Sequence, residues 1–321
     1  MRVVITGGFG FIGTLVAREL LATGMFRGNE LTELVLADRF VRRDDDPIVT
    51  NPRSVVVEGD LLDTLPTIFA KRVDAVIHLA SAVSAEAEAD FDLGMTANLH
   101  STHALLEAAR RQPGEPATVV FSSSVAVYGS DPALPLPRVV SEATLPTPQS
   151  SYGAQKFICE QLVADYTRKG FIDGRVARLM TVAVRPGKPN AAASGFLSGI
   201  IREPLAGIAT VCPVRPELAV ALASPRRTVE GLLRVAQADM DSRIAVNLPA
   251  LTVTVAEMLD TLRRVAGDAV ADLVLVEPDP AVEAIVGSWP ARFDNSRAAA
   301  LGLTGDASFA DVVKQYREDN L

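Results

Sequence analysis

The chain begins with a short apolar run, a cluster of glycines and a segment with helical periodicity, and this order allows few folds. Residues 3–6 predict a strand and residues 11–21 predict a helix, so the glycines of residues 7–13 lie in a tight turn between them. Backbone N–H groups in such a turn can approach a pyrophosphate, and the helix N-terminus adds a favourable partial charge. An ordinary strand–helix turn can also be rich in glycine, but this context favours a dinucleotide site.

Similar apolar runs recur along the first half of the chain and are separated by segments compatible with helices. They occupy residues 33–37, 54–57, 75–80 and 118–121. Runs that are apolar on both faces suit parallel strands covered by helices on each side. We therefore predict an α/β fold with a doubly wound parallel sheet, the Rossmann arrangement.

Five prolines between residues 131 and 148 exclude a regular helix or central strand and predict a long loop. A loop that leaves the carboxyl end of a parallel strand usually lies beside the ligand crevice, so we expect this one to cover the substrate. Residues 152–169 predict a helix and residues 175–184 a strand. After residues 185–189 the alternation of strands and helices becomes irregular, which marks the start of a second lobe.

Residues 244–248 predict one more core strand, so the second lobe is expected to be discontinuous. The predicted organisation is a Rossmann core of residues 1–184 and about 226–262, with a smaller C-terminal substrate lobe of about 185–225 and 263–321.

Asp38 ends the second apolar run and bears on the choice of cofactor. A carboxylate there can accept hydrogen bonds from the adenosine ribose hydroxyls and repels a 2′-phosphate, which favours NAD over NADP. Arg39, Arg42 and Arg43 follow closely and could instead pair with a 2′-phosphate. Because the acid stands at the strand end itself, we predict NAD.

Tyr152 and Lys156 are spaced i and i+4 on the predicted helix and so share one face. A phenol with a pKa of about 10 is a poor base at neutral pH unless a nearby cation stabilises its anion. The serines of residues 122–124 follow a buried strand and bring hydroxyl groups to the carboxyl edge of the same sheet. The Tyr–Lys spacing alone is common, but its combination with the glycine turn, the strand-end acid and the serines predicts a catalytic site.

With these motifs in this order, the sequence resembles the short-chain dehydrogenase/reductase superfamily, in its extended branch of sugar-nucleotide epimerases, dehydratases and related dehydrogenases. The resemblance covers roughly residues 1–184. It implies that Ser124, Tyr152 and Lys156 are catalytic, with the tyrosine as proton acceptor. The cofactor-binding residues it implies are Gly7, Gly10, Phe11, Ile12, Gly13, Asp38, Asp60, Leu61, Leu79, Ala80, Ser81, Asn98, Tyr152, Lys156, Thr181 and Val182.

A closer resemblance, to dehydrogenases of the four-carbon sugar acid D-erythronate, extends over the full chain. It is carried by residues 85–92, 147–156, 184–194 and 211–214. Thr181 stands where the sugar-nucleotide branch commonly has asparagine, which also speaks against a UDP-sugar. The resemblance implies NAD-dependent oxidation of the 2-hydroxyl of a short sugar acid. A sugar-nucleotide epimerase or dehydratase that retains NAD, and an inactive NAD(P)-sensing protein, are the alternatives.

Arg185, Lys188 and Asn190 cluster after the predicted strand end, where a charged fork could hold a carboxylate. Basic residues in such a turn can equally be solvated. Trp289 is expected to pack in the interior rather than to stack on a ligand. The predicted substrate-binding residues are Ser81, Ser124, Tyr152, Thr181, Arg185, Lys188 and Asn190.

Composition limits the partners and the location. A formal net charge of −8 argues against a strongly basic nucleic-acid binder, and no apolar run approaches the length of a membrane span. Two cysteines in 321 residues fit a reducing compartment, so we expect a cytoplasmic protein. His100 and His103 lack a third ligand, so we expect no metal. The expected partners are a small-molecule substrate and, from the family resemblance, a second copy in a homodimer.

Overall fold

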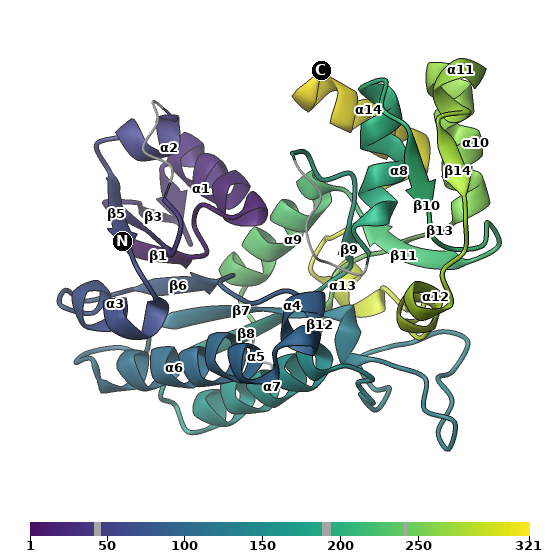
Figure 1. The fold of residues 1–321 in the computed structure, drawn as a ribbon. Coiled ribbons are helices and arrows are strands. Elements are labelled where there is room, and N and C mark those ends of the chain that lie inside the picture. Colours follow the sequence, from purple (N-terminus) through teal and green to yellow (C-terminus); the bar gives the residue numbers. More distant parts are fainter. Residues whose placement is uncertain (42–45, 188–193, 241–242) are drawn as a thin grey trace.

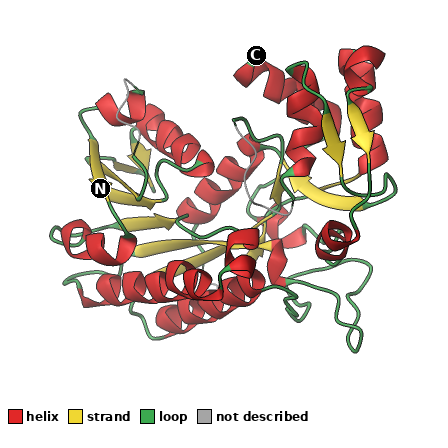
Figure 2. Ribbon diagram, in the orientation of Figure 1, coloured by secondary structure: helices red, strands yellow, loops and turns green. Residues whose placement is uncertain are grey.

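The computed structural model describes residues 1–41, 46–187, 194–240 and 243–321. Seven parallel strands form its main sheet in the order β12-β8-β7-β6-β1-β4-β5 (Figures 1 and 2). Their bounds are β1 (Arg2–Thr6), β4 (Glu33–Asp38), β5 (Ser54–Glu58), β6 (Ala75–His78), β7 (Thr118–Ser124), β8 (Asp173–Leu179) and β12 (Val246–Asn247). The predicted doubly wound sheet is confirmed.

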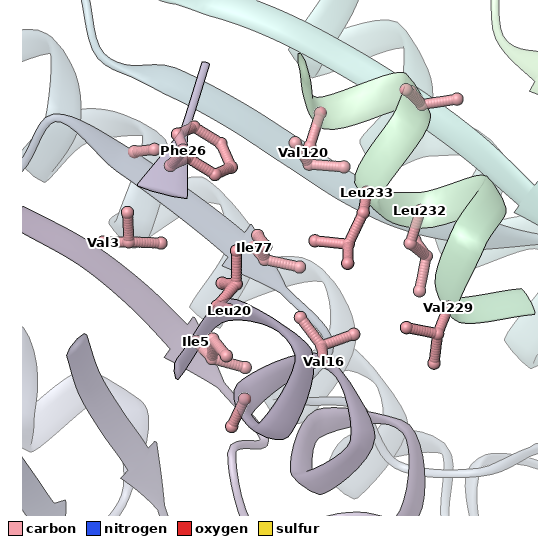
Figure 3. Close-up of a cluster of buried hydrophobic side chains, with 14 of the residues drawn as sticks. Val3, Ile5, Val16, Leu20, Phe26, Ile77, Val120, Val229, Leu232 and Leu233 are labelled. Carbon is pink, nitrogen blue, oxygen red and sulfur yellow. The ribbon is translucent and has the colours of Figure 1, made fainter. Parts of the chain in front are cut away.

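Helices cover both faces of this sheet because successive strand residues point to opposite sides. Val3 and Ile5 of β1 pack with α1 (Phe11–Thr23) and α9 (Pro225–Gln237), as Figure 3 shows. Val4, between them, belongs to the cluster on the other face. That cluster is covered by α3 (Leu61–Ile68), α6 (Ser101–Arg111) and α7 (Ser151–Arg168).

The predicted strand of residues 175–184 is interrupted. β8 ends at Leu179, and β9 (Thr181–Val182) pairs with a different strand, β11 (Ala219–Ala223), outside the main sheet. The Ala183 N–H donates to the Ala223 carbonyl, so the backbone groups beyond β8 are satisfied by the new partner. The break at this point turns the chain across the carboxyl end of the main sheet.

The C-terminal part packs around its own hydrophobic cluster, which includes Val253, Met258 and Leu262. Its strands are β9, β11 and β13 (Leu251–Thr254) in one sheet, with β10 (Thr210–Cys212) and β14 (Val274–Val276) paired in another. Its helices are α8 (Phe196–Leu205), α10 (Val255–Ala266), α11 (Asp268–Ala271), α12 (Pro280–Gly287) and α14 (Phe309–Asn320).

The division into lobes stays a proposal, with one change to its bounds. The sequence placed residues up to about 262 in the core, whereas β13 and α10 contribute to the C-terminal cluster. Ala298, in turn, packs in the core cluster beside α9. We therefore propose that the second core segment ends at about residue 250, so that β13 and α10 belong to the C-terminal lobe.

The shorter elements connect these layers. They are α2 (Pro47–Thr50), α4 (Ser84–Ala89), α5 (Phe91–Gly94), the π-helix η1 (Met95–His100), the 3-10 turn η2 (Val125–Val127), α13 (Ser296–Ala300), β2 (Met25–Phe26) and β3 (Asn29–Glu30). No helix in the described parts of the chain combines the length and the apolar character needed to cross a membrane.

The proline-rich segment of residues 131–148 contains no helix and only an isolated bridge within itself. It is tied to the C-terminal lobe, since the Val140 N–H donates to the Arg292 carbonyl at 2.9 Å and the Asp294 N–H donates to the Val140 carbonyl at 2.8 Å. The predicted loop therefore bridges the core and the lobe.

Candidate active site

A cavity of about 710 Å³ lies where the carboxyl ends of the main-sheet strands meet the C-terminal lobe. This is the edge at which open α/β sheets bind ligands. It is lined by most of the residues predicted for the site: Gly7, Gly10, Phe11, Ile12, Gly13, Asp38, Asp60, Leu61, Leu79, Ala80, Ser81, Ser124, Tyr152, Lys156, Thr181, Val182 and Arg185. The predicted substrate residues Lys188 and Asn190 lie outside the described residues.

The glycine turn is packed too tightly for side chains. Gly7 has a φ of +71°, and a Cβ there would lie 2.8 Å from the backbone nitrogen of Ala80. A Cβ on Gly13 would overlap the Gly7 carbonyl oxygen. Gly10 caps α1 without a side-chain hydrogen bond, so no side chain occupies the N-terminus of this helix. The N–H groups of Gly7, Gly8 and Gly10 bond to carbonyls within the protein, so the anion cradle formed here is the N-terminus of α1.

Asp38 is held at the end of β4 by backbone donors. Its carboxylate accepts from the Phe9 N–H at 2.9 Å and from the Phe40 N–H at 3.2 Å. Arg39 turns toward a different acid, with its Nε 4.0 Å from Asp60 Oδ2, and both of these side chains are largely exposed. Arg42 and Arg43 lie outside the described residues.

Asn98 does not line the cavity, although it was predicted to contact the cofactor. Its side chain is buried and its Oδ1 accepts from the Ser81 hydroxyl and from the Ala82 N–H, both at 2.8 Å. Its Nδ2 donates to Gln155 Oε1 at 2.8 Å. Asn98 therefore ties the Ser81 side chain and the Ala82 backbone to the helix that carries Tyr152.

Tyr152 projects from the first turn of α7 toward two serines. The hydroxyls of Ser124 and Ser81 lie near its phenol, and each of them lowers its pKa. Burial has the larger effect and raises the pKa of Tyr152 to about 12. The Ser124 Oγ accepts from the Ala126 N–H at 3.1 Å, which leaves its own proton free to be donated into the cavity.

Lys156 lies one turn further along α7 and is almost fully buried. Its Nζ donates to the Ser122 carbonyl at 2.9 Å and lies 4.8 Å from the Phe121 ring centroid and 5.5 Å from that of Tyr152. Burial lowers the pKa of Lys156 to about 8. The ammonium form still predominates at neutral pH.

From the Tyr–Lys spacing in the sequence, Lys156 was expected to be the cation that lowers the pKa of Tyr152. In the structure the cation whose charge lowers that pKa is Arg185, and burial outweighs its effect. Arg185 follows β9 and is half-buried. Its backbone is fixed on both sides, because its N–H donates to the Ser198 hydroxyl at 3.0 Å and its carbonyl accepts from Arg202 Nη1 at 2.7 Å.

A buried ionic network packs against α7, the helix that carries Tyr152 and Lys156. Arg178 of β8 forms a bidentate pair with Glu160 of α7, with N–O distances of 2.5 and 2.8 Å. Glu160 also accepts from the Ser123 hydroxyl, and Arg178 also donates to the Tyr128 hydroxyl. The network thus joins α7 to the strand that carries Ser124.

We expect Arg178→Met to lower the free energy of unfolding by about 3–5 kcal/mol, because Glu160 would remain buried without its partner. Urea denaturation would measure this loss. The double variant Glu160→Met/Arg178→Met removes both charges, so it should recover most of the stability. A double variant as unstable as the single one would show that packing, not the unpaired charge, causes the loss.

Residues 3–215 match the model of the NAD dependent epimerase/dehydratase family. The chain belongs to this family. It is 50% identical to a D-erythronate dehydrogenase of Cupriavidus necator, over 99% of this chain and 98% of the relative. It is 42% identical to a D-erythronate dehydrogenase of Haemophilus influenzae, over 99% of both chains. The resemblance inferred from the sequence motifs is confirmed.

Solved structures with the same fold include two enzymes. The chain superimposes with a TM-score of 0.91 on a nucleoside-diphosphate-sugar epimerase from Agrobacterium tumefaciens, at 37% identity, covering 100% of this chain and 94% of the other. It also matches an L-threonine 3-dehydrogenase from Trypanosoma brucei, with a TM-score of 0.84 at 21% identity over 99% of this chain and 96% of the other. The second likeness concerns the fold alone.

Several cavity residues of this family member were not predicted from its sequence. Phe40 follows the strand-end acid, Glu86 lies in the first turn of α4, and Trp289 comes from the C-terminal lobe. No spacing relation connects Trp289 to the motifs of the core. In the described ranges no cluster of three His, Cys, Asp or Glu side chains is placed to hold a metal ion.

Proposed function

We propose that this protein oxidises the 2-hydroxyl of D-erythronate to give 2-dehydro-D-erythronate, with NAD as the oxidant. The observation that carries the proposal is the position of the Tyr152 phenol near the Ser124 and Ser81 hydroxyls, in a cavity that Arg185 also lines. A proton acceptor, a hydroxyl donor and a cation suited to a carboxylate then face one small substrate. Two relatives similar over nearly the full chain are dehydrogenases of this sugar acid.

The glycine cradle and Asp38 fit a dinucleotide. The N-terminus of α1, free of a side-chain cap, suits a pyrophosphate, and the Asp38 carboxylate suits a ribose diol. Lys156 would contact the nicotinamide ribose. When bound, NAD supplies the hydride acceptor and a positively charged ring.

Two residues of this chain, Ser124 and Tyr152, act on the hydroxyl group of the substrate. Ser124 donates a hydrogen bond to the reacting oxygen and holds it beside Tyr152, which accepts the hydroxyl proton. Since burial raises the pKa of Tyr152 to about 12, proton transfer needs positive charge near the phenol. Arg185 supplies part of this charge while it holds the substrate carboxylate.

The test is an assay of net turnover. Protein mixed with NAD and D-erythronate should accumulate NADH in proportion to the acid consumed, as followed by absorbance. An epimerase that retains and recycles NAD would show no net change with either a sugar acid or a sugar nucleotide. Tight NAD binding without any reaction would support the sensing alternative.

We expect at least a tenfold preference for NAD over NADP in kcat/KM, equivalent to about 1.4 kcal/mol. The reason is repulsion between the Asp38 carboxylate and a 2′-phosphate. Asp38→Ser should reduce or abolish the preference, and Arg39→Ala is the matched control for the neighbouring cation. Equal use of the two cofactors by the parent would show that a nearby arginine overrides the acid.

We also propose a cytoplasmic location, because Cys159 and Cys212 are both unpaired thiols. The substrate partner is the sugar acid. The homodimer expected from the family resemblance stays a prediction.

A further inference from the structure

Trp289 is the single tryptophan of the chain and follows α12 in the C-terminal lobe. Its side chain is half-buried and lines the same cavity as Tyr152 and Arg185. It also packs against the hydrophobic cluster of the lobe. Tyr152 comes from the core helix α7, so the core and the lobe each contribute an aromatic residue to the wall of the site.

The backbone around Trp289 is held by segments from both parts of the molecule. The Trp289 N–H itself donates to the Val286 carbonyl at 3.3 Å. Backbone carbonyls on either side of Trp289 accept three further hydrogen bonds. The Ser130 N–H, just before the proline-rich loop, donates to the Ser288 carbonyl at 3.2 Å, and the Val140 N–H of that loop donates to the Arg292 carbonyl at 2.9 Å. The Thr252 hydroxyl of β13 donates to the Ala291 carbonyl at 2.5 Å. The backbone on both sides of Trp289 is thus held in place, and the indole, packed against the lobe cluster, forms a wall of the cavity.

The chemistry around the phenol is otherwise polar. Ser81, Ser124 and Arg185 offer hydroxyl groups and a guanidinium, which suit the carboxylate and the 2-hydroxyl of an aldonic acid. These two groups sit on adjacent carbons of the substrate, so Arg185 and Tyr152 together fix its first two carbons. Each further carbon of a longer acid adds bulk and a hydroxyl that must find room and a partner.

The Trp289 indole offers little of either. Its faces are apolar and it has only one N–H donor. A hydroxyl pressed against an apolar face loses its hydrogen bonds to water without replacement, and a fixed wall also excludes extra carbons sterically. Such a wall discriminates between sugar acids by the length of their carbon chain rather than by their charge.

We propose that Trp289 is a specificity-determining residue that restricts the substrate to short sugar acids by closing the cavity beyond the reacting carbon. The inference rests on the proposed function, because it takes the substrate to be an aldonic acid held by Arg185 and Tyr152. It predicts that a four-carbon acid is a better substrate than a six-carbon one.

The test compares kcat/KM for D-erythronate and for D-gluconate in the parent, Trp289→Phe and Trp289→Ala. The four-carbon to six-carbon ratio should fall at least tenfold in Trp289→Ala, with the phenylalanine variant in between. An unchanged ratio would overturn the inference. If the parent oxidises neither acid, it is the proposed function that fails.

Phe293→Leu is the matched control, because it lies in the same segment but does not line the cavity. Its ring packs against Tyr128, with the ring centroids 6.0 Å apart. We expect this variant to leave the substrate ratio at the parent value. A shift as large as that of Trp289→Ala would mean that the segment as a whole, not the indole, sets the ratio, and would contradict the inference.

Fluorescence gives a second readout that does not depend on turnover. As the chain has one tryptophan, its indole emission reports on Trp289 alone. Tyr152→Phe protein saturated with NAD should show a saturable change in this emission when D-erythronate is added, because the acid displaces water from the indole. If the parent turns over D-erythronate and the emission of the variant stays constant, Trp289 does not contact the substrate and the inference is wrong.

Discussion

Replacing Tyr152 by phenylalanine is expected to lower kcat for D-erythronate by about 10²–10⁴, the usual range for a positioned acid–base group. The variant loses only the phenolic oxygen near Ser124 and Ser81, so its fold and its NAD affinity should be unchanged. The parent should also become more active from neutral to alkaline pH, since the pKa of its phenol lies near 12 and deprotonation increases with pH. The variant should lack that dependence. Steady-state kinetics over pH, with direct NAD titration, measure both effects.

Tyr166→Phe is the matched control for this change. Tyr166 lies on the same helix, and its hydroxyl donates to Glu107 instead of pointing into the cavity. We expect its kcat to stay near the parent value. If Tyr152→Phe retains parental turnover while Tyr166→Phe does too, the proton acceptor lies elsewhere.

Arg185→Ala is expected to lower kcat/KM for D-erythronate by about 100-fold, because a charge-assisted pair to the carboxylate contributes about 1.5–3 kcal/mol and Arg185 also acts on Tyr152. Loss of the carboxylate contact should raise KM, since that contact is similar in ground and transition states. Loss of its charge beside the phenol should lower kcat and move the pH dependence to more alkaline values. NAD affinity should change little.

Arg185→Lys separates these two contributions. Lysine keeps a positive charge but cannot engage both carboxylate oxygens through a planar fork. It should therefore recover more of kcat than of KM. An alanine variant with unaltered KM and kcat would place the carboxylate site elsewhere, with Lys188 and Asn190 as the next residues to replace.

The sequence alone was enough to predict the sheet and the glycine turn after its first strand. Each parallel strand is a short apolar run, and each face of β1 is specified by alternate residues such as Val3 and Val4. Gly7 and Gly13 must lack side chains, because a Cβ at either position would collide with backbone atoms. For Gly13 these atoms lie in the turn itself, and for Gly7 they lie just after the adjacent strand β6. Tyr152 and Lys156 share a face because helical spacing is a local property.

Other features of the site depended on contacts between distant segments. Asn98 was predicted to contact the cofactor, but its amide is engaged by Ser81, Ala82 and Gln155. The pKa of Tyr152 is governed by burial, which requires the whole cavity wall and cannot be read from the Tyr–Lys spacing.

The substrate end was decided by the tertiary structure. Residues 175–184 form an apolar run, but the chain leaves the main sheet after Leu179 because β11 offers new backbone partners to β9. That change of sheet places Arg185 at the cavity. Trp289 reaches the same cavity from more than 100 residues further along the chain. Local periodicity specifies which elements form, whereas only long-range packing specifies which side chains meet.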